Sequence, residues 1–169
     1  MNAWKVTDYG PIFSTRQPGC GMIEVMSLET DQEIQEKIAP VSGLVPMLPV
    51  LDVERSATFY QLLGFAVGNR VPRNGRMNWA WLYQPKVPDW RRGPNLMLSR
   101  SDGAIEPAAQ RILFYLYAAN LVALREELLT VGQSPGQIRY PDYLPKGEFE
   151  LTDPDGYRLM IAQSGEDTP

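Results

Sequence analysis

The chain has 169 residues, 44% of them hydrophobic, which is enough for one packed domain or for one domain with an extension. Its formal net charge of −4 argues against nucleic acid and against anionic membrane as partners, because both require a basic patch. The sequence contains no histidine. This excludes His-ligated zinc, a two-histidine iron site, and the Ser–His and Cys–His catalytic pairs.

The remaining general features indicate a cytoplasmic protein. A single cysteine, Cys20, excludes an internal disulfide and fits a reducing compartment. The N-terminal stretch "MNAWKVTDYGPIF" lacks the apolar core of a signal peptide. The longest apolar run, "LVPMLPVL", is too short to span a bilayer. We therefore expect a soluble chain without a membrane partner.

Residues 1–43 are expected to be an N-terminal extension that carries one short helix. Within it, the segment "TDQEIQEKIAP" begins with a capping box formed by Thr30 and Glu33, and a proline stops it. Ile34 and Ile38 form a narrow apolar stripe on this helix. We expect the stripe to dock on the domain as a packing appendage without chemistry.

From residue 44 onward the chain repeats itself. The stretches "LVPMLPVLDVERSATFYQLLG" and "ILFYLYAANLVALREELLTVG" each predict a short apolar strand followed by an amphipathic helix. Asp52 and Asn120 are the expected helix caps, and Gly64 and Gly132 the expected stops, twelve residues later in both copies. The expected buried helix faces are Val53, Ala57, Tyr60 and Leu63 in the first copy and Leu121, Leu124, Leu128 and Val131 in the second.

Strand-like segments follow each helix. They are "FAVGNRV", "MNWAWLYQ" and "NLMLSR" after the first, and a weak segment in "SPGQIRYPDY", then "EFELT" and "YRLMIA", after the second. The pattern is an α+β fold of two tandem βαβββ modules with the helices on one side of the sheet. We place the modules at about 44–100 and 111–164, within a domain that spans 44–169.

Three of these pieces together carry a resemblance: "LPVLDVERSATFYQLLGF", "NLVALREELLTVG" and "DPDGYRLMI". They resemble the glyoxalase/bleomycin resistance protein/dioxygenase group, the vicinal oxygen chelate superfamily. The resemblance implies that the two modules form a cupped mixed sheet around one cleft. It also implies a homodimer, because members of this length often build each cleft from two chains.

The resemblance further assigns four metal-ligand positions, which Val45, Met97, Leu113 and Met160 occupy in this sequence. Valine and leucine offer no donor atom, and a methionine sulfur is a soft ligand unsuited to a hard dication. We therefore expect no metal and no cofactor, and neither glyoxalase nor dioxygenase chemistry. Within the superfamily, these residues make the chain resemble most the metal-free bleomycin resistance proteins, which bind a drug and catalyse nothing.

Alternation along the strands then predicts which side chains face the cleft. Strand residues point to opposite faces in turn, so the four family positions fix the facing of their neighbours. The turn "DPDG" predicts a type I turn closed by a glycine bulge, which places Glu150 opposite Met160. The expected cleft residues are Met47, Trp79, Trp81, Met97, Tyr115, Tyr117, Glu148, Glu150, Arg158 and Met160.

Aromatic, methionine and carboxylate side chains together suit a planar or amphipathic organic molecule, and a carboxylate would fix an amine. Sequestration of such a molecule, as in antibiotic resistance, is the first hypothesis. The alternative is a metal-independent isomerase or lyase in which Glu150 is a general base of raised pKa, assisted by Tyr115 or Arg158. Glu150 and Arg158 can also simply pair with each other, the aromatic residues can serve packing, and a protein-binding module is a third interpretation.

Overall fold

The computed structural model describes residues 43–89 and 93–165, which belong to one compact unit that begins at Val41. The expected N-terminal helix and its Ile34 and Ile38 lie outside the described residues. Among the residues that are described, no helix is long and apolar enough to cross a bilayer.

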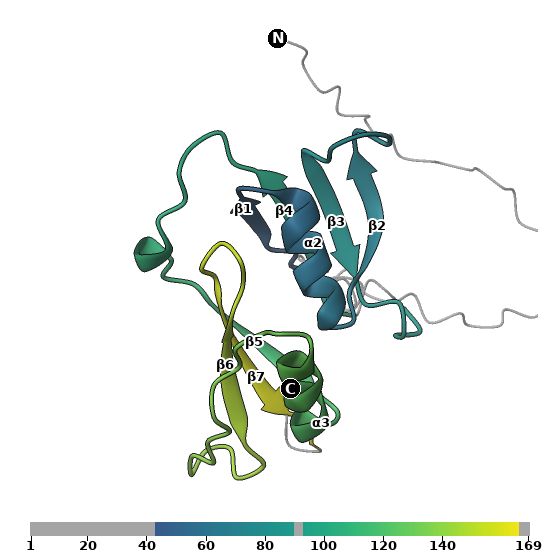
Figure 1. The fold of residues 1–169 in the computed structure, drawn as a ribbon. Coiled ribbons are helices and arrows are strands. Elements are labelled where there is room, and N and C mark those ends of the chain that lie inside the picture. The colour runs from purple at the N-terminus through teal and green to yellow at the C-terminus, as the bar shows by residue number, and fades with distance from the viewer. Residues whose placement is uncertain (1–42, 90–92, 166–169) are drawn as a thin grey trace, which may run out of the picture. The chain divides into compact units, whose positions relative to one another are not determined.

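The first module has the order strand, helix, three strands. Its elements are β1 (Met47–Val50), α2 (Val53–Leu62), β2 (Ala66–Val71), β3 (Trp79–Tyr83) and β4 (Asn95–Arg100). The strands form one sheet in the order β1-β4-β3-β2, in which β1 and β4 are parallel and the other neighbours are antiparallel. Figure 1 shows α2 packed along this sheet.

The second module repeats this plan with one strand fewer. A 3-10 turn, η1 (Pro107–Ala109), precedes β5 (Leu113–Ala118), and α3 (Leu121–Thr130), β6 (Glu148–Thr152) and β7 (Arg158–Gln163) follow (Figure 1). They form a separate sheet in the order β5-β7-β6, with β5 and β7 parallel. The strands thus make two mixed sheets, where a single cupped sheet was expected.

The missing strand is the weak segment after the second helix. It is reduced to one isolated bridge between Arg139 and Glu148. Pro135 and Pro141 flank this short stretch. Because proline has no amide hydrogen to give to a ladder, the segment cannot extend along β6 as a full strand.

The expected helix boundaries are confirmed in both copies. The carboxylate of Asp52 accepts a hydrogen bond from the amide of Arg55, and the side chain of Asn120 accepts one from the amide of Ala123, both at 3.0 Å. Gly64 and Gly132 follow the helices with φ of +86° and +80°, a conformation that favours glycine.

The helix faces are confirmed with one exception. On α2, Val53, Ala57 and Tyr60 are buried, and on α3, Leu121 and Leu128 are buried. Leu63 and Leu124 are partly buried and pack against the core. Val131 was expected on the buried face and is exposed instead. It is the C-cap residue of α3, where the chain already leaves the helix, so its side chain no longer follows the helical stripe.

The turn between β6 and β7 joins the two modules through two buried aspartates. The carboxylate of Asp153 accepts hydrogen bonds from the amides of Asp155 and Tyr157 and, at 3.1 Å, from the hydroxyl of Tyr60 on α2. Burial raises the pKa of Asp153. The same turn shows the predicted glycine bulge, with Gly156 at φ +89°.

Asp155 forms the second part of this junction. Its carboxylate accepts from the amide of Leu51 at 3.0 Å, and from the Ser56 hydroxyl and the Arg55 guanidinium, both at 2.8 Å. The side chain of Asp155 is fully buried, whereas that of Arg55 is 47% exposed. All three donors belong to the first module, so this one carboxylate ties the hairpin of the second module to it.

Removing the carboxylate of Asp155 should therefore destabilise the domain. We expect Asp155→Ala to lower the free energy of unfolding by about 2–3 kcal/mol, because it leaves buried donors without an acceptor. Urea denaturation followed by circular dichroism measures the change. Asp102→Ala, at an exposed aspartate, is the control, and equal losses in the two variants would show that the junction does not hold the modules together.

Candidate functional site

Each sheet has one face against a helix and one face without a helix. The predicted alternation is confirmed on β1, β3 and β4, whereas β6 and β7 also bury Glu148 and Met160, which were assigned to the uncovered side. Residues assigned to the helix side are buried or partly buried: Leu48, Val50, Ala80, Leu82, Leu96, Leu98, Phe114, Leu116, Phe149, Leu151, Leu159 and Ile161. The predicted register of the hairpin is also confirmed, since Glu150 lies opposite Met160 and Glu148 opposite Ala162. The expected site residues therefore lie on the uncovered faces.

The uncovered face of the first sheet presents three aromatic rings along β3. Trp79, Trp81 and Tyr83 alternate with the buried Ala80 and Leu82. The rings of Trp81 and Tyr83 are stacked, with centroids 5.0 Å apart and planes 11° from parallel. We call the surface formed by Trp79, Trp81 and Tyr83 the aromatic face.

Two neighbouring residues, the polar Asn95 and the small Gly68, fix the position of the Trp81 ring. Its indole Nε1 donates a 2.9 Å hydrogen bond to Oδ1 of Asn95 on β4. A Cβ atom on Gly68 of β2 would lie 2.4 Å from Cζ3 of Trp81, so the ring covers backbone that only glycine leaves accessible. The aromatic face is therefore preorganised by its neighbouring strands.

A hollow of about 560 Å³ lies over the aromatic face. This volume is in the range of small-molecule sites. It carries no ionisable side chain other than the tyrosine hydroxyl and is lined by Val45, Gly68, Asn69, Trp79, Trp81, Tyr83, Asn95 and Met97. What this surface can do is stack against a flat ring and offer amide hydrogen bonds from its two asparagines.

The uncovered face of the second sheet is polar. We call it the tyrosine–glutamate face, and it comprises Tyr115, Tyr117, Glu148, Glu150, Arg158 and Met160. Tyr115 and Tyr117 are exposed and their rings lie 5.6 Å apart. Met160 is buried although no helix covers this side.

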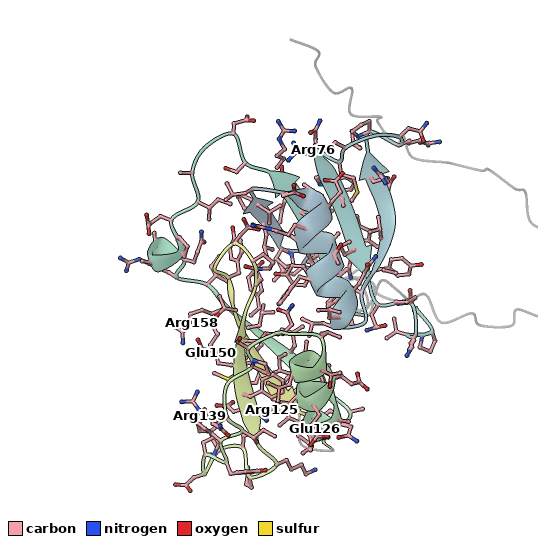
Figure 2. All side chains as sticks on the ribbon, in the orientation of Figure 1. Arg76, Arg125, Glu126, Arg139, Glu150 and Arg158 are labelled. Carbon is pink, nitrogen blue, oxygen red and sulfur yellow. The ribbon has the colours of Figure 1, made fainter. Side chains whose placement is uncertain are left out.

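Glu150 and Arg158 pair with each other on this face. Figure 2 shows the two side chains together on the side of the β6–β7 hairpin away from α3. Nε and Nη2 of Arg158 donate to the two carboxylate oxygens of Glu150 at 2.8 and 3.1 Å. These hydrogen bonds lower the pKa of Glu150 and raise that of Arg158.

The expectation of a raised pKa at Glu150 is therefore wrong. An apolar surround would favour the protonated carboxyl, but the guanidinium fork stabilises the ionised form. A lowered pKa makes Glu150 a poorer general base. The hydroxyl of Tyr115 likewise donates a hydrogen bond to Glu148. Both groups of the metal-independent hypothesis are thus engaged in hydrogen bonds within the protein.

Of the four positions that the resemblance assigns to metal ligands, Val45 lies just before β1 and lines the hollow over the aromatic face together with Met97. Leu113 and Met160 lie on the neighbouring strands β5 and β7. None of the four positions carries a donor suited to a hard cation. Across residues 43–89 and 93–165, no group of three or more Asp, Glu or Cys side chains could hold a metal ion.

Four site residues escaped the sequence analysis. Tyr83 follows Trp79 and Trp81 by simple alternation, and Asn95 has the same relation to Met97, so both were accessible to the argument already used. Asn69 is hidden by an irregularity in the pairing of β2 with β3 between Val67 and Asn69. Gly68 has no sequence signal, because its role depends on the ring of Trp81 across the sheet.

A second hollow of about 550 Å³ runs along α3. It is lined by Leu62 and by residues of or next to α3, among them Glu126, Glu127 and Val131. It contains no aromatic ring, and its carboxylates lie on an ordinary solvated helix face. We therefore place the candidate site on the aromatic face and use this groove as the competing location.

The comparisons with known proteins place the fold. No family model matches the sequence, and no curated protein matches it. By structure, 140 chains match. A bleomycin-binding protein complexed with bleomycin has a TM-score of 0.55 and 22% identity over 74% of this chain and 100% of its own.

Two further structures illustrate the range of matches. A bleomycin resistance determinant encoded on the transposon Tn5 has a TM-score of 0.56 and 22% identity, covering 73% of this chain and 98% of its own. A glyoxalase-related enzyme from Clostridium phytofermentans has a TM-score of 0.54 and 13% identity, covering 76% and 99%. The same fold therefore occurs in antibiotic-binding proteins and in a glyoxalase-related enzyme.

The contact between Gly68 and Trp81 makes the aromatic face testable without a ligand. We expect Gly68→Ala to displace the Trp81 ring from Tyr83 and to change the near-ultraviolet circular dichroism spectrum. The far-ultraviolet spectrum should stay unchanged, and overpacking should cost about 1–3 kcal/mol. Gly103→Ala is the control, because nothing lies within 4 Å of a Cβ there. A wild-type near-ultraviolet spectrum in Gly68→Ala would contradict this packing.

Proposed function

We propose that this chain, whose fold is that of the bleomycin-binding and glyoxalase-related proteins, binds and sequesters a planar or amphipathic organic molecule without a metal. The observation that carries the proposal is the aromatic face. Its stacked Trp81 and Tyr83 lie under a 560 Å³ hollow rather than under a helix. Solved proteins of this fold include antibiotic-binding ones, among them one complexed with bleomycin and an antibiotic-binding protein from a Streptomyces species.

The physical argument is preorganisation. A flat ligand gains area burial and offset stacking on a tryptophan whose orientation is already set by Asn95 and by Gly68. Little conformational entropy is then lost on binding, so contact energy is converted into affinity. The asparagine amides at 69 and 95 can orient the ligand through its hydrogen-bonding groups.

Binding without catalysis is the form of this function that the side chains support. No carboxylate, lysine or arginine lines the hollow over the aromatic face. The carboxylate proposed as a base, Glu150, is held ionised by Arg158 on the other sheet. Such a surface suits retention of a ligand, and the Tyr83 hydroxyl is its one ionisable group.

We further propose that the protein is a homodimer. Large apolar side chains gather on the uncovered faces of the sheets, where Met47, Val71, Leu113, Tyr115 and Tyr117 are all exposed. Single chains rarely leave this much apolar surface in water. A second copy of the chain is the occupant that would cover these faces and deepen the hollow between them.

The dimer is tested by light scattering after size exclusion. We expect a mass of twice the 19.1 kDa of one chain. Leu113→Asp, which places a charge among the exposed apolar side chains, should shift the mass to that of a single chain while the far-ultraviolet spectrum stays native. A wild-type protein that remains monomeric at high micromolar concentration would contradict the proposal.

Ligand binding is tested by tryptophan fluorescence. Titration with planar aromatic compounds, including metal-free bleomycin, should change the emission, with and without chelator. Trp81→Ala should weaken binding by about 10- to 100-fold through lost stacking, an effect of roughly 1–3 kcal/mol. Val131→Ala, in the groove along α3, is the control. If Val131→Ala weakens binding and Trp81→Ala does not, the ligand occupies the groove instead.

A further inference from the structure

Glu148 is a buried carboxylate on a sheet face that no helix covers. Only 3% of the residue is exposed. Each of its carboxylate oxygens accepts a hydrogen bond from a tyrosine hydroxyl: Oε2 from Tyr115 on β5, and Oε1 from Tyr143 in the loop before β6, the latter at 2.7 Å. Burial of a carboxylate is costly unless it is compensated, so these bonds call for an explanation.

Glu148 has no cationic partner within the described chain. Among residues 43–89 and 93–165, no lysine or arginine forms an ion pair with it. Arg139 bridges to Glu148 only through the backbone, although its charge acts on Tyr143 and Glu150. By contrast, the neighbouring Glu150 is fully engaged by Arg158. One carboxylate of this face is therefore compensated and the other is not.

The two tyrosines place their phenolic oxygens between the carboxylate of Glu148 and the surface. Each hydroxyl proton points to Glu148, which leaves the lone pairs of both phenolic oxygens for a further donor. Burial and the hydrogen bond to Glu148 raise the pKa of Tyr115, and the hydrogen bond to Glu148 raises that of Tyr143. Both phenols thus stay protonated, and their rings are exposed. Oxygens polarised in this way, beside aromatic rings, attract a cation.

We propose that Glu148, with Tyr115 and Tyr143, forms a subsite for a positively charged amine group on the bound organic molecule. An ammonium group is small and carries several donors, so it can reach both phenolic oxygens at once while its charge offsets that of the carboxylate. A single carboxylate with neutral phenols does not meet the ligand demand of a divalent cation. The subsite therefore selects amines.

This subsite rests on the proposed function and narrows its ligand. Tyr115 also lines a hollow of about 220 Å³, whose other lining residues belong mainly to the hydrophobic core, among them Leu48 and Leu159. A molecule with a flat ring and an amine-bearing arm would use both surfaces, with the ring on the aromatic face and the amine at Glu148. The ligand class is thus an aromatic amine whose charge is carried on a side arm.

A matched pair of probes tests the subsite separately from the aromatic face. Dansylcadaverine carries a flat fluorophore and a primary ammonium arm, and N-pentyl dansylamide carries the same fluorophore and chain without the amine. We expect the wild-type protein to bind the ammonium probe about 10- to 100-fold more tightly, as for a charge-assisted hydrogen bond. Glu148→Gln, which keeps the shape of the side chain, should abolish this preference and leave the affinity for the neutral probe unchanged.

Two further variants complete the test. Tyr143→Phe removes one hydroxyl from an exposed ring, so it should keep the fold and reduce the preference several-fold. Glu150→Gln is the matched control and should leave the preference intact, because Arg158 already compensates that carboxylate. Thermal melts verify that each variant is folded.

The contradicting outcomes are distinct. If the wild-type protein binds both probes equally, or if Glu150→Gln removes the preference and Glu148→Gln does not, the subsite is overturned while the proposed function stands. If Glu148→Gln does not fold, the result with Tyr143→Phe decides alone. If the wild-type protein binds neither these probes nor the planar compounds of the fluorescence titration, the proposed function and the subsite fall together.

Discussion

One helix covers one face of each sheet, and this constraint decides which strand positions must be apolar. Positions that alternate toward α2 or α3 must be apolar and fill the core, as Leu82 and Phe149 do. Positions that alternate away are free of that demand, and there the chain carries tryptophan, tyrosine, glutamate and arginine. Because large aromatic rings on an uncovered sheet are costly in water, their presence on β3 is the strongest sign of a binding surface.

The two modules share a plan but divide the chemistry. The first offers flat rings and amide groups without charge, with Trp81 at its centre. The second offers two carboxylates in different electrostatic states, one paired with Arg158 and one held by tyrosine hydroxyls. The buried Asp155 ties the second module to the first through its hydrogen bonds to Leu51, Ser56 and Arg55. The fold thus presents an apolar and a polar surface within one compact unit.

The fold was accessible from the sequence because its signals are local and repeated. Caps at Asp52 and Asn120, the glycine stops and strand alternation are all set by neighbouring residues, and the turn at Gly156 fixes the register that puts Glu150 opposite Met160. Alternation along a strand predicts the face on which a side chain lies but not the side chain with which it pairs. For Glu150, pairing with Arg158 was only one of the alternatives, beside a ligand contact and a role as general base.

Other features depend on contacts that no periodic pattern in the sequence encodes. Tyr143 reaches Glu148 from an irregular loop that has no periodicity to read. Gly68 matters only because Trp81 lies across it on the next strand. The second sheet has three strands because the proline-flanked segment around Arg139 forms a single bridge. Sequence patterning predicted the faces, whereas pairing within each face required the three-dimensional structure.

The central claim is that an organic ligand lies on the aromatic face, and the indole N–H resonances of the four tryptophans test it most directly. In a ¹⁵N-labelled sample, titration with dansylcadaverine should shift the indole resonances of Trp79 and Trp81, and Trp81 most, because its N–H is the donor to Asn95. Unchanged Trp79 and Trp81 resonances at saturating ligand, with shifts confined to amides along α3, would contradict the account.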